Sequence, residues 1–101
     1  MKVKVKIATL HPEHLLEYER LHREIPKINE RHMTEGGYQR MEILRAGNTL
    51  IMLLESDDSK DIKSLTEFTE AAEAWRKQTE PCFATPWQDA NEIYRFSALA
   101  P

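Results

Sequence analysis

Two polar side chains interrupt an apolar stripe near the start of the chain. Tyr18 and His22 are four residues apart, so on a helix they lie next to each other on one face. A histidine is the side chain best suited to proton transfer near neutral pH, and a tyrosine hydroxyl can donate or accept a hydrogen bond. The pair therefore fits acid–base chemistry on a small polar ligand, although two semi-buried residues with satisfied hydrogen bonds would give the same pattern.

Three further side chains could complete such a site. Trp75 falls on the apolar stripe of a later predicted helix, where it would either fill the core or form a platform for a ligand. Tyr38 and Arg40 are predicted to share one face of a strand, opposite Met41 and Ile43. If that face borders a pocket, its hydroxyl and guanidinium groups are donors suited to a polyol. Otherwise both side chains face solvent.

The sequence gives little support for phosphate binding, nucleophilic catalysis or metal binding. The sequence has no glycine-rich phosphate loop and no G-x-S-x-G nucleophile motif. Cys82 is the only cysteine, has no convincing catalytic partner and is interpreted as a structural thiol. His11 and His14 are three residues apart, but Pro12 opens a helix between them and no matching ligand pair follows. We therefore predict no metal site.

Composition limits the class of protein. The chain has 101 residues, of which 41% are hydrophobic and 31% charged, so we predict a single globular domain over residues 1–101. The net charge is -3 and the basic residues are scattered, which argues against nucleic-acid binding. One cysteine excludes an intramolecular disulfide, and we find no membrane-spanning segment or signal peptide. We expect a cytoplasmic protein.

The elements that would position these residues follow from the hydrophobic pattern. Residues 2–7 alternate between lysine and an apolar residue, which predicts a half-buried strand. A helix should begin at Pro12, carry the tyrosine–histidine pair on its apolar face and break at Pro26. The apolar residues Ile28 and Met33 suggest that a second helical piece follows the break.

A predicted β-hairpin occupies the middle of the sequence. Residues 38–44 and 50–55 should form two strands, joined by a short connection at Ala46-Gly47-Asn48. The second of these strands is almost continuously apolar, which is typical of a strand covered on both faces. We therefore expect something to cover each face of this strand.

The last third of the chain predicts one helix and one strand. Ser64 and Glu67 have capping-box spacing, and an amphipathic helix should run from there to Pro81. Residues 81–86 are expected to form a loop. Residues 92–96 are rich in Ile, Tyr and Phe, which predicts the final strand.

The predicted order is β-α-β-β-α-β, an α+β arrangement called ferredoxin-like. Its four-stranded sheet carries helices on one face only, so the other face must meet water, a ligand or another sheet. The apolar strand argues against water, and two such sheets packed face to face would form a dimeric α/β barrel. A pocket would then lie between each sheet and its own helices, or inside the barrel.

Three segments of the sequence carry a resemblance to a known family. They are the helix segment EYERLH at 17–22, the hairpin MEILRAGNTLIM at 41–52, and Trp75-Arg76. Together they resemble the L-rhamnose mutarotase family, in the right order and over nearly the whole chain. The hairpin, followed by Glu55 and Asp57-Asp58, is more similar to members associated with L-fucose.

The resemblance implies a homodimeric α/β barrel that interconverts the α and β anomers of a 6-deoxyhexose, L-rhamnose or L-fucose, without cofactor or metal. It implies that His22 is the proton donor and that Tyr18 is a sugar-binding hydroxyl. Trp75 and Arg76 occupy the positions of an aromatic pair that binds sugar in the family, so Arg76 replaces the second aromatic. The sugar-contacting tyrosine of the rhamnose enzymes aligns nearest Arg40, with Tyr38 two residues earlier, and either could make that contact.

A further departure lies after the catalytic helix segment. The family usually has a Trp-Pro step where Ile25 here runs directly into Pro26. A changed sugar preference, or binding without activity, would be consistent with this departure. Two other functions on the same fold therefore stay open. One is a non-catalytic sugar-binding or regulatory domain, and the other is a cofactor-independent monooxygenase acting on an aromatic substrate.

Overall fold

The computed structural model describes residues 2–56 and 69–98. Its main elements are β1 (Lys2–Leu10), α1 (Leu15–Arg23), α2 (Lys27–Glu35), β2 (Tyr38–Ala46), β3 (Thr49–Ser56), α3 (Thr69–Thr79) and β4 (Phe83–Asp89). Short 3-10 helices precede α1 at Pro12–His14 and follow α3 at Glu80–Cys82. The predicted α+β class and element order are confirmed. The capping box predicted at Ser64 and Glu67 lies outside the described residues.

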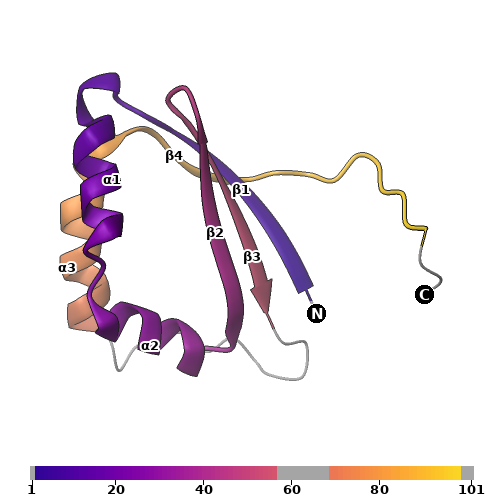
Figure 1. Ribbon diagram of the computed structural model, residues 1–101, viewed down its shortest axis with the longest axis horizontal. Coiled ribbons are helices and arrows are strands. Elements are labelled where there is room, and N and C mark those ends of the chain that lie inside the picture. Colours follow the sequence, from indigo (N-terminus) through magenta and orange to yellow (C-terminus); the bar gives the residue numbers. More distant parts are fainter. Residues whose placement is uncertain (1, 57–68, 99–101) are drawn as a thin grey trace.

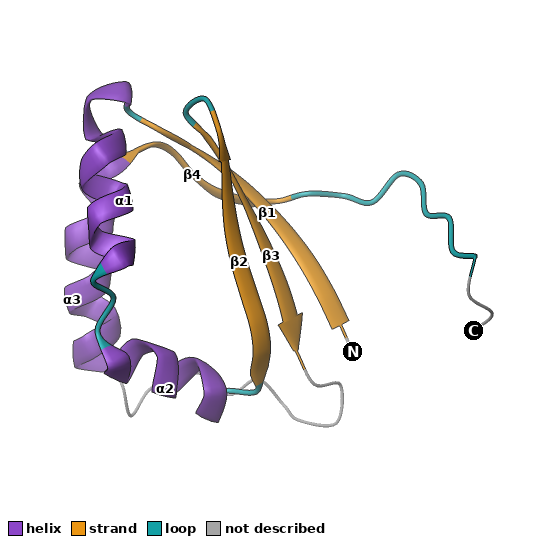
Figure 2. Ribbon diagram, in the orientation of Figure 1, coloured by secondary structure: helices purple, strands orange, loops and turns teal. Residues whose placement is uncertain are grey.

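The four strands form one antiparallel sheet in the order β2-β3-β1-β4. This is the ferredoxin-like order that the element sequence predicted. The helices lie on one face of the sheet, and α1 and α3 run side by side in that layer (Figures 1 and 2). No helix among the described residues is long and apolar enough to cross a membrane.

The helical segment breaks at Pro26, as predicted. This proline lacks a backbone N–H and has an extended conformation (φ −62°, ψ 136°), so α1 cannot continue through it. Helix α2 leaves the direction of α1 and runs across from the helical layer towards the start of β2 (Figure 1). A left-handed Gly37 (φ 97°) then makes the turn into β2. As a result α2 bridges the helical layer and the sheet at one end of the molecule.

The final strand differs from the prediction. The expectation that residues 81–86 form a loop is wrong, because they overlap β4, and the expected strand at 92–96 is absent. Among the described residues β4 is an edge strand that pairs with β1 alone, so it can accommodate Pro86, and two register shifts interrupt this pairing. The C-terminal segment instead extends away from the sheet, with Ile93 and Phe96 97% and 76% exposed (Figure 1).

A tightly packed core lies where β1 ends and β3 begins. Its buried members are Ala8, Leu10, Tyr18, Leu50 and Cys82. Backbone hydrogen bonds close this end: the Leu10 N–H donates to the Asn48 carbonyl (2.8 Å), and the His11 N–H donates to the Cys82 carbonyl (2.8 Å). The strands, α1 and the 3-10 helix after α3 are therefore held together at this end.

The face of the sheet opposite the helices is also apolar. In the register between β1 and β3, Val5 pairs with Leu53 and Ile7 with Ile51, whereas Leu50 lies on the helix-covered face. Val3 and Ile7 are 51% and 42% exposed in the single chain. The alternation predicted for β1 is thus present, and its apolar side chains lie on the face that carries no helix among the described residues.

Candidate active site

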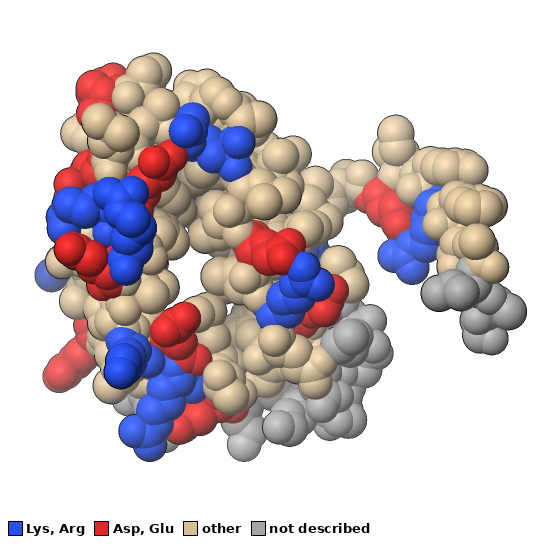
Figure 3. Space-filling model, viewed as in Figure 1, with Lys and Arg blue, Asp and Glu red and all other residues tan. Residues whose placement is uncertain are grey.

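A cavity of about 250 Å³ lies between the helical layer and the sheet, next to the packed core. Residues of α1, α2 and α3 and of β2, β3 and β4 line it. Figure 3 shows the molecule hollowed at this place, between the helices and the sheet. The cavity exists because α2 crosses from one layer to the other and holds the layers apart at its end of the molecule.

Tyr18 and His22 both border this cavity from α1. Their rings contact each other, with centroids 4.3 Å apart. Tyr18 is buried and belongs to the packed core as well, whereas His22 is only partly buried. The helical spacing read from the sequence therefore brings a proton-transfer group and a phenol together at the cavity wall.

A hydrogen bond fixes the orientation of the His22 ring. Its Nδ1 lies 2.9 Å from the backbone carbonyl oxygen of Tyr18, one helical turn earlier. A carbonyl oxygen can only accept, so Nδ1–H is the donor and the other ring nitrogen, Nε2, is left for chemistry. Neutral His22 can then accept a proton at Nε2, and the imidazolium can donate one there.

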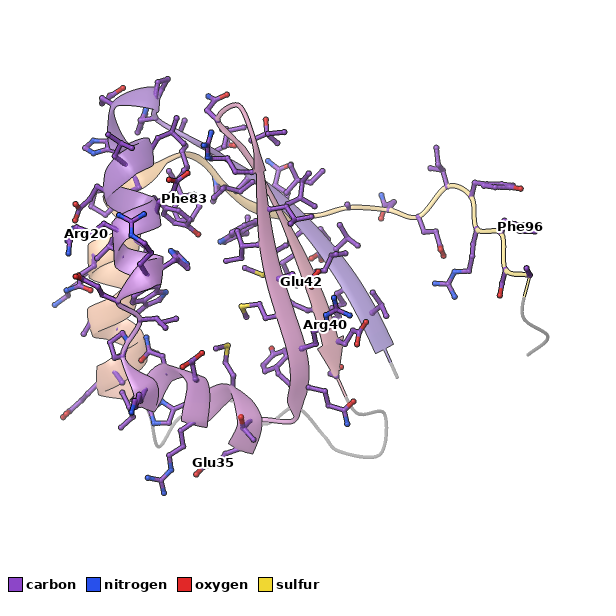
Figure 4. The ribbon with its side chains drawn as sticks, in the orientation of Figure 1. Arg20, Glu35, Arg40, Glu42, Phe83 and Phe96 are labelled. Atoms are coloured by element: carbon purple, nitrogen blue, oxygen red, sulfur yellow. The ribbon has the colours of Figure 1, made fainter. Side chains whose placement is uncertain are left out.

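Further aromatic rings contact this pair on both sides and form a continuous row with it. Trp75 of α3 meets the His22 ring edge-on at 5.0 Å between centroids, and Phe83 of β4 meets Tyr18 at 5.5 Å. Phe83 in turn contacts Trp87 at 5.7 Å. Figure 4 shows Phe83 in the space between α1 and the sheet. These rings give the cavity an apolar, aromatic wall beside the proton-transfer group.

Burial keeps the Tyr18 hydroxyl protonated. Desolvation is the larger cause that raises the pKa of Tyr18 above its ordinary value of 10.0, and the nearby Cys82 adds to it. A phenol with a raised pKa is a neutral hydrogen-bond donor at physiological pH and a poor base. Tyr18 is therefore suited to hold a hydroxyl or a water, while His22 is suited to move the proton.

The sheet side of the cavity is mostly apolar and flexible. Met41 and Ile43 of β2 and Met52 of β3 lie there, and Met33 of α2 faces them. Methionine side chains adapt to irregular ligand shapes. Within the described part of the chain, no Asp, Glu, Lys or Arg lines the cavity. The polar chemistry is therefore concentrated on the helices.

Sequence reasoning missed three polar residues of this lining, Asn29 and His32 of α2 and Thr79 of α3. His32 is 5% exposed. The signal was present, because successive residues of a helix are 100° apart, so Ile28 and Met33 lie 140° apart and cannot share a narrow face. Asn29, His32 and Met33 do fall within one arc of about 100°.

Tyr38 and Arg40 lie on different faces of the sheet, so the prediction that they share a face is wrong. A register shift between them pairs Tyr38 with Ser56 and Arg40 with Glu55. Such an irregularity reverses the alternation along a strand. Tyr38 consequently lies on the face of the helices. Arg40 lies on the opposite face, where it forms an ion pair with Glu42 that raises its pKa (Figure 4).

The structure places Arg76 outside the cavity lining. Its guanidinium donates to Glu80 (Nη1 to Oε2, 2.5 Å) and to Glu73 (Nε to Oε2, 3.2 Å), along the exposed side of α3. These carboxylates raise the pKa of Arg76, with the Glu73 hydrogen bond as the largest cause. Of the six residues predicted for the site, Tyr18, His22 and Trp75 line the cavity, whereas Tyr38, Arg40 and Arg76 do not.

Neither a metal site nor an activated cysteine emerges from the described residues. They contain no group of three or more His, Cys, Asp or Glu side chains arranged to hold a metal ion. Cys82 is buried in the packed core, and burial is the largest cause that raises the pKa of its thiol. The site therefore consists of two imidazoles, a protonated phenol, amide and hydroxyl groups, and aromatic rings.

Solved structures with the same fold include several enzymes. An L-rhamnose mutarotase from Formosa agariphila superposes with a TM-score of 0.77 at 10% identity, over 96% of this chain and 100% of that chain. A protein from Nitrosomonas europaea described as an antibiotic biosynthesis monooxygenase gives 0.65 at 18% identity, over 93% and 100%. Tetracenomycin F2 cyclase from Streptomyces glaucescens gives 0.58 at 16% identity, over the full length of both chains. At these identities the likeness concerns the fold.

A comparison with curated proteins gives no significant match. The family model described as L-rhamnose mutarotase, in contrast, matches residues 4–99, almost the entire sequence. The match includes both α1, with Tyr18 and His22, and α3, with Trp75. With the shared fold and the cavity already established, this chain belongs to the L-rhamnose mutarotase family.

Proposed function

We propose that this protein is a mutarotase that interconverts the α and β anomers of a 6-deoxyhexose, either L-rhamnose or L-fucose. The observation that carries the proposal is the arrangement of His22. Its Nδ1 is engaged by the Tyr18 carbonyl oxygen, no hydrogen bond within the described residues engages its Nε2, and the Trp75 ring meets the imidazole edge-on at 5.0 Å between centroids in the wall of the same cavity. A positioned proton-transfer group beside an aromatic wall suits a sugar ring, which has both hydroxyls and an apolar face.

The reaction requires two proton transfers. A base removes the proton from the anomeric hydroxyl while an acid protonates the ring oxygen, so the bond from C1 to the ring oxygen breaks and the free aldehyde forms. Rotation about the C1–C2 bond and reversal of both transfers then give the other anomer. No electrons or groups are exchanged with a co-reactant. The chemistry therefore needs only groups that hold and move protons.

We assign the ring-oxygen proton to His22 and the support of the second transfer to Tyr18. Since the raised pKa of Tyr18 keeps its hydroxyl protonated, this residue would act by holding a water or the anomeric hydroxyl. Trp75 would stack on the apolar face of the sugar, with the methyl group towards the methionines. Arg40 lies on the opposite face of the sheet, so it would not contribute to this cavity. A contribution from Arg76 would require its side chain to leave the ion pairs with Glu73 and Glu80.

The decisive experiment is NMR saturation transfer between the anomeric proton signals of L-rhamnose and, separately, of L-fucose. Wild-type protein should accelerate exchange, and His22→Ala should slow the catalysed rate by about 10²- to 10⁴-fold. His14→Ala is a matched control, because His14 precedes α1 and lies outside the cavity lining. If wild type accelerates neither sugar, the proposed activity is wrong.

The same samples distinguish the other functions. Saturable binding of a sugar without faster exchange would favour a binding or regulatory domain. Preferential binding of a flat polycyclic aromatic compound would favour the monooxygenase alternative, for which the apolar lining of Met41, Ile43 and Met52 offers some support. In both cases the fold and the cavity would be unaffected.

We also propose a homodimer in which the helix-free sheet faces pack together. Val3, Ile7 and Leu44 expose much of their apolar surface on this face in the single chain. A small domain gains stability by covering such a surface with a second copy. Sedimentation velocity should give a dimer for wild type and a monomer for Ile7→Arg, which places a charge in the centre of the sheet. A wild-type monomer would refute the proposal.

A further inference from the structure

Helix α2 distributes its polar and apolar side chains differently from a helix that merely packs against a sheet. Ile28 is 50% exposed, whereas its neighbour Asn29 and the next turn's His32 face the cavity. Placing an apolar side chain outward and a polar amide inward costs stability. Natural proteins break local patterns in this way mainly at functional sites.

Few of the polar groups near the cavity are available to form hydrogen bonds with the hydroxyls of a sugar. The Thr79 hydroxyl donates to the Trp75 carbonyl (3.1 Å), so its proton is already used. His22 and Tyr18 are assigned to proton transfer. The Arg76 guanidinium points along the exposed side of α3, towards Glu73 and Glu80. Asn29 and His32 of α2 remain to orient the sugar, and His32, which is 5% exposed, is the more deeply buried of the two.

Asn29 has the chemistry that this task needs. Its side-chain amide offers two N–H donors and a carbonyl acceptor side by side, which matches two adjacent hydroxyls. Its backbone is fixed at the start of α2, where the Asn29 N–H donates to the Pro26 carbonyl (3.0 Å). Within the described residues, no side-chain hydrogen bond occupies this amide, and the residue lines the cavity on a different helix from His22.

We propose that Asn29 is a specificity-determining residue, whose side-chain amide binds two adjacent ring hydroxyls of the 6-deoxyhexose. This inference rests on the proposed function. L-Rhamnose and L-fucose have opposite configurations at C2 and C4, so the pairs of neighbouring hydroxyls differ in geometry between the two sugars. An amide fixed on α2 can match one of these arrangements better than the other. Asn29 would then determine which sugar is preferred, whereas His22 performs the chemistry on both.

The test compares Asn29→Ala with wild type on both sugars, using saturation transfer over a range of sugar concentrations. For the preferred sugar we expect KM to rise about tenfold, because a hydrogen-bonded pair is lost, while kcat changes less than about threefold. The preference between L-rhamnose and L-fucose should fall by a similar factor. Glu30→Ala, the adjacent exposed residue of the same helix, should change neither quantity.

A second variant and a second measurement keep the outcome decisive. Asn29→Asp retains an acceptor but loses the donors. Its preference between L-rhamnose and L-fucose should therefore differ from that of wild type, even if Asn29→Ala is poorly folded. Sugar binding followed by the fluorescence of Trp75 and Trp87, which line the cavity, gives dissociation constants that need no catalysis.

These measurements separate failure of the inference from failure of the proposed function. Folded Asn29 variants with an unchanged ratio of rates and an unchanged ratio of dissociation constants would overturn the inference while mutarotation stands. Wild type that binds the sugars without accelerating exchange would refute mutarotation, and the dissociation constants would still decide the role of Asn29. Wild type that binds neither sugar would overturn both.

Discussion

The two ends of the space between the sheet and the helices differ in their packing. At one end Ala8, Leu10, Leu50 and Cys82 pack into a buried core, and backbone hydrogen bonds close it. At the other end α2 crosses between the layers and leaves a cavity with polar side chains on its helical side and apolar ones on its sheet side. The difference indicates a division of labour along the same elements, in which one end stabilises the fold and the other accommodates a ligand.

The largest stability effect should come from a pair of substitutions on β3. Leu50 and Met52 project from the same face, two residues apart, but Leu50 is 2% exposed in the core and Met52 lines the cavity. Leu50→Ala should lower the free energy of unfolding by about 3–5 kcal/mol, since it creates a new void. Met52→Ala should cost about 1–2 kcal/mol, because it only enlarges an existing one. Urea unfolding of both variants measures the difference.

The order of effects should be reversed when these two substitutions are compared by the KM for the sugar. Met52→Ala should change the KM for the sugar, whereas Leu50→Ala should leave it unchanged in protein that remains folded at low temperature. Equal losses of stability, together with equal changes in KM, would show that the two ends are not distinct.

Tyr18 belongs both to the packed core and to the cavity lining, so a substitution at this residue is the next test of the division between the two ends. Tyr18→Phe retains the ring that packs on Phe83 and removes only the hydroxyl. At neutral pH we expect the free energy of unfolding to change by less than about 1 kcal/mol and the catalysed rate to fall about tenfold. Tyr94→Phe, on the exposed C-terminal segment, is the matched control and should affect neither. A large loss of stability would assign the hydroxyl to the packed end instead.

The raised pKa of Tyr18 also predicts the direction in which the free energy of unfolding changes with pH. Burial raises the pKa of folded Tyr18 above its ordinary value of 10.0, so the unfolded chain loses this proton first as the pH rises. The stabilising contribution of the neutral phenol is complete below pH 10 and is lost as the pH rises above it. Wild type should therefore lose more stability than Tyr18→Phe between pH 8 and pH 11, measured by urea unfolding. Parallel curves would contradict burial as the cause.

Local patterns predicted much of this architecture. The alternation in β1, the hairpin between β2 and β3, and the break at Pro26 depend on residues close together in the sequence, and all three are present. Likewise the four-residue spacing of Tyr18 and His22 is a local property of a helix, so their contact could be predicted. The same helical periodicity predicted that Trp75 lies on the apolar face of α3, and this residue lines the cavity.

Features that depend on long-range pairing could not be predicted in this way. Residues 92–96 have strong β-propensity, but a strand exists only where a partner offers hydrogen bonds, and β1 pairs with β4 instead. Similarly, the separation of Tyr38 from Arg40 arises from a register shift against β3, which leaves no local signal. The covered face of β1 is also decided by where the helices pack, not by the alternation itself.

The smallest effect concerns Cys82, at the packed end. This thiol is 2% exposed, and burial raises its pKa, so little reactive thiolate should form at pH 8. Iodoacetamide should therefore alkylate the folded protein at least about tenfold more slowly than the same protein unfolded in guanidinium chloride. Because Cys82 is the only cysteine, mass spectrometry reports this site alone. Saturating sugar should slow alkylation only as far as binding to the folded state lowers the population of unfolded chain, since the cavity lies at the other end. A larger slowing would show that ligand binding reaches the packed core, and the two ends would then have to be treated as one cooperative unit.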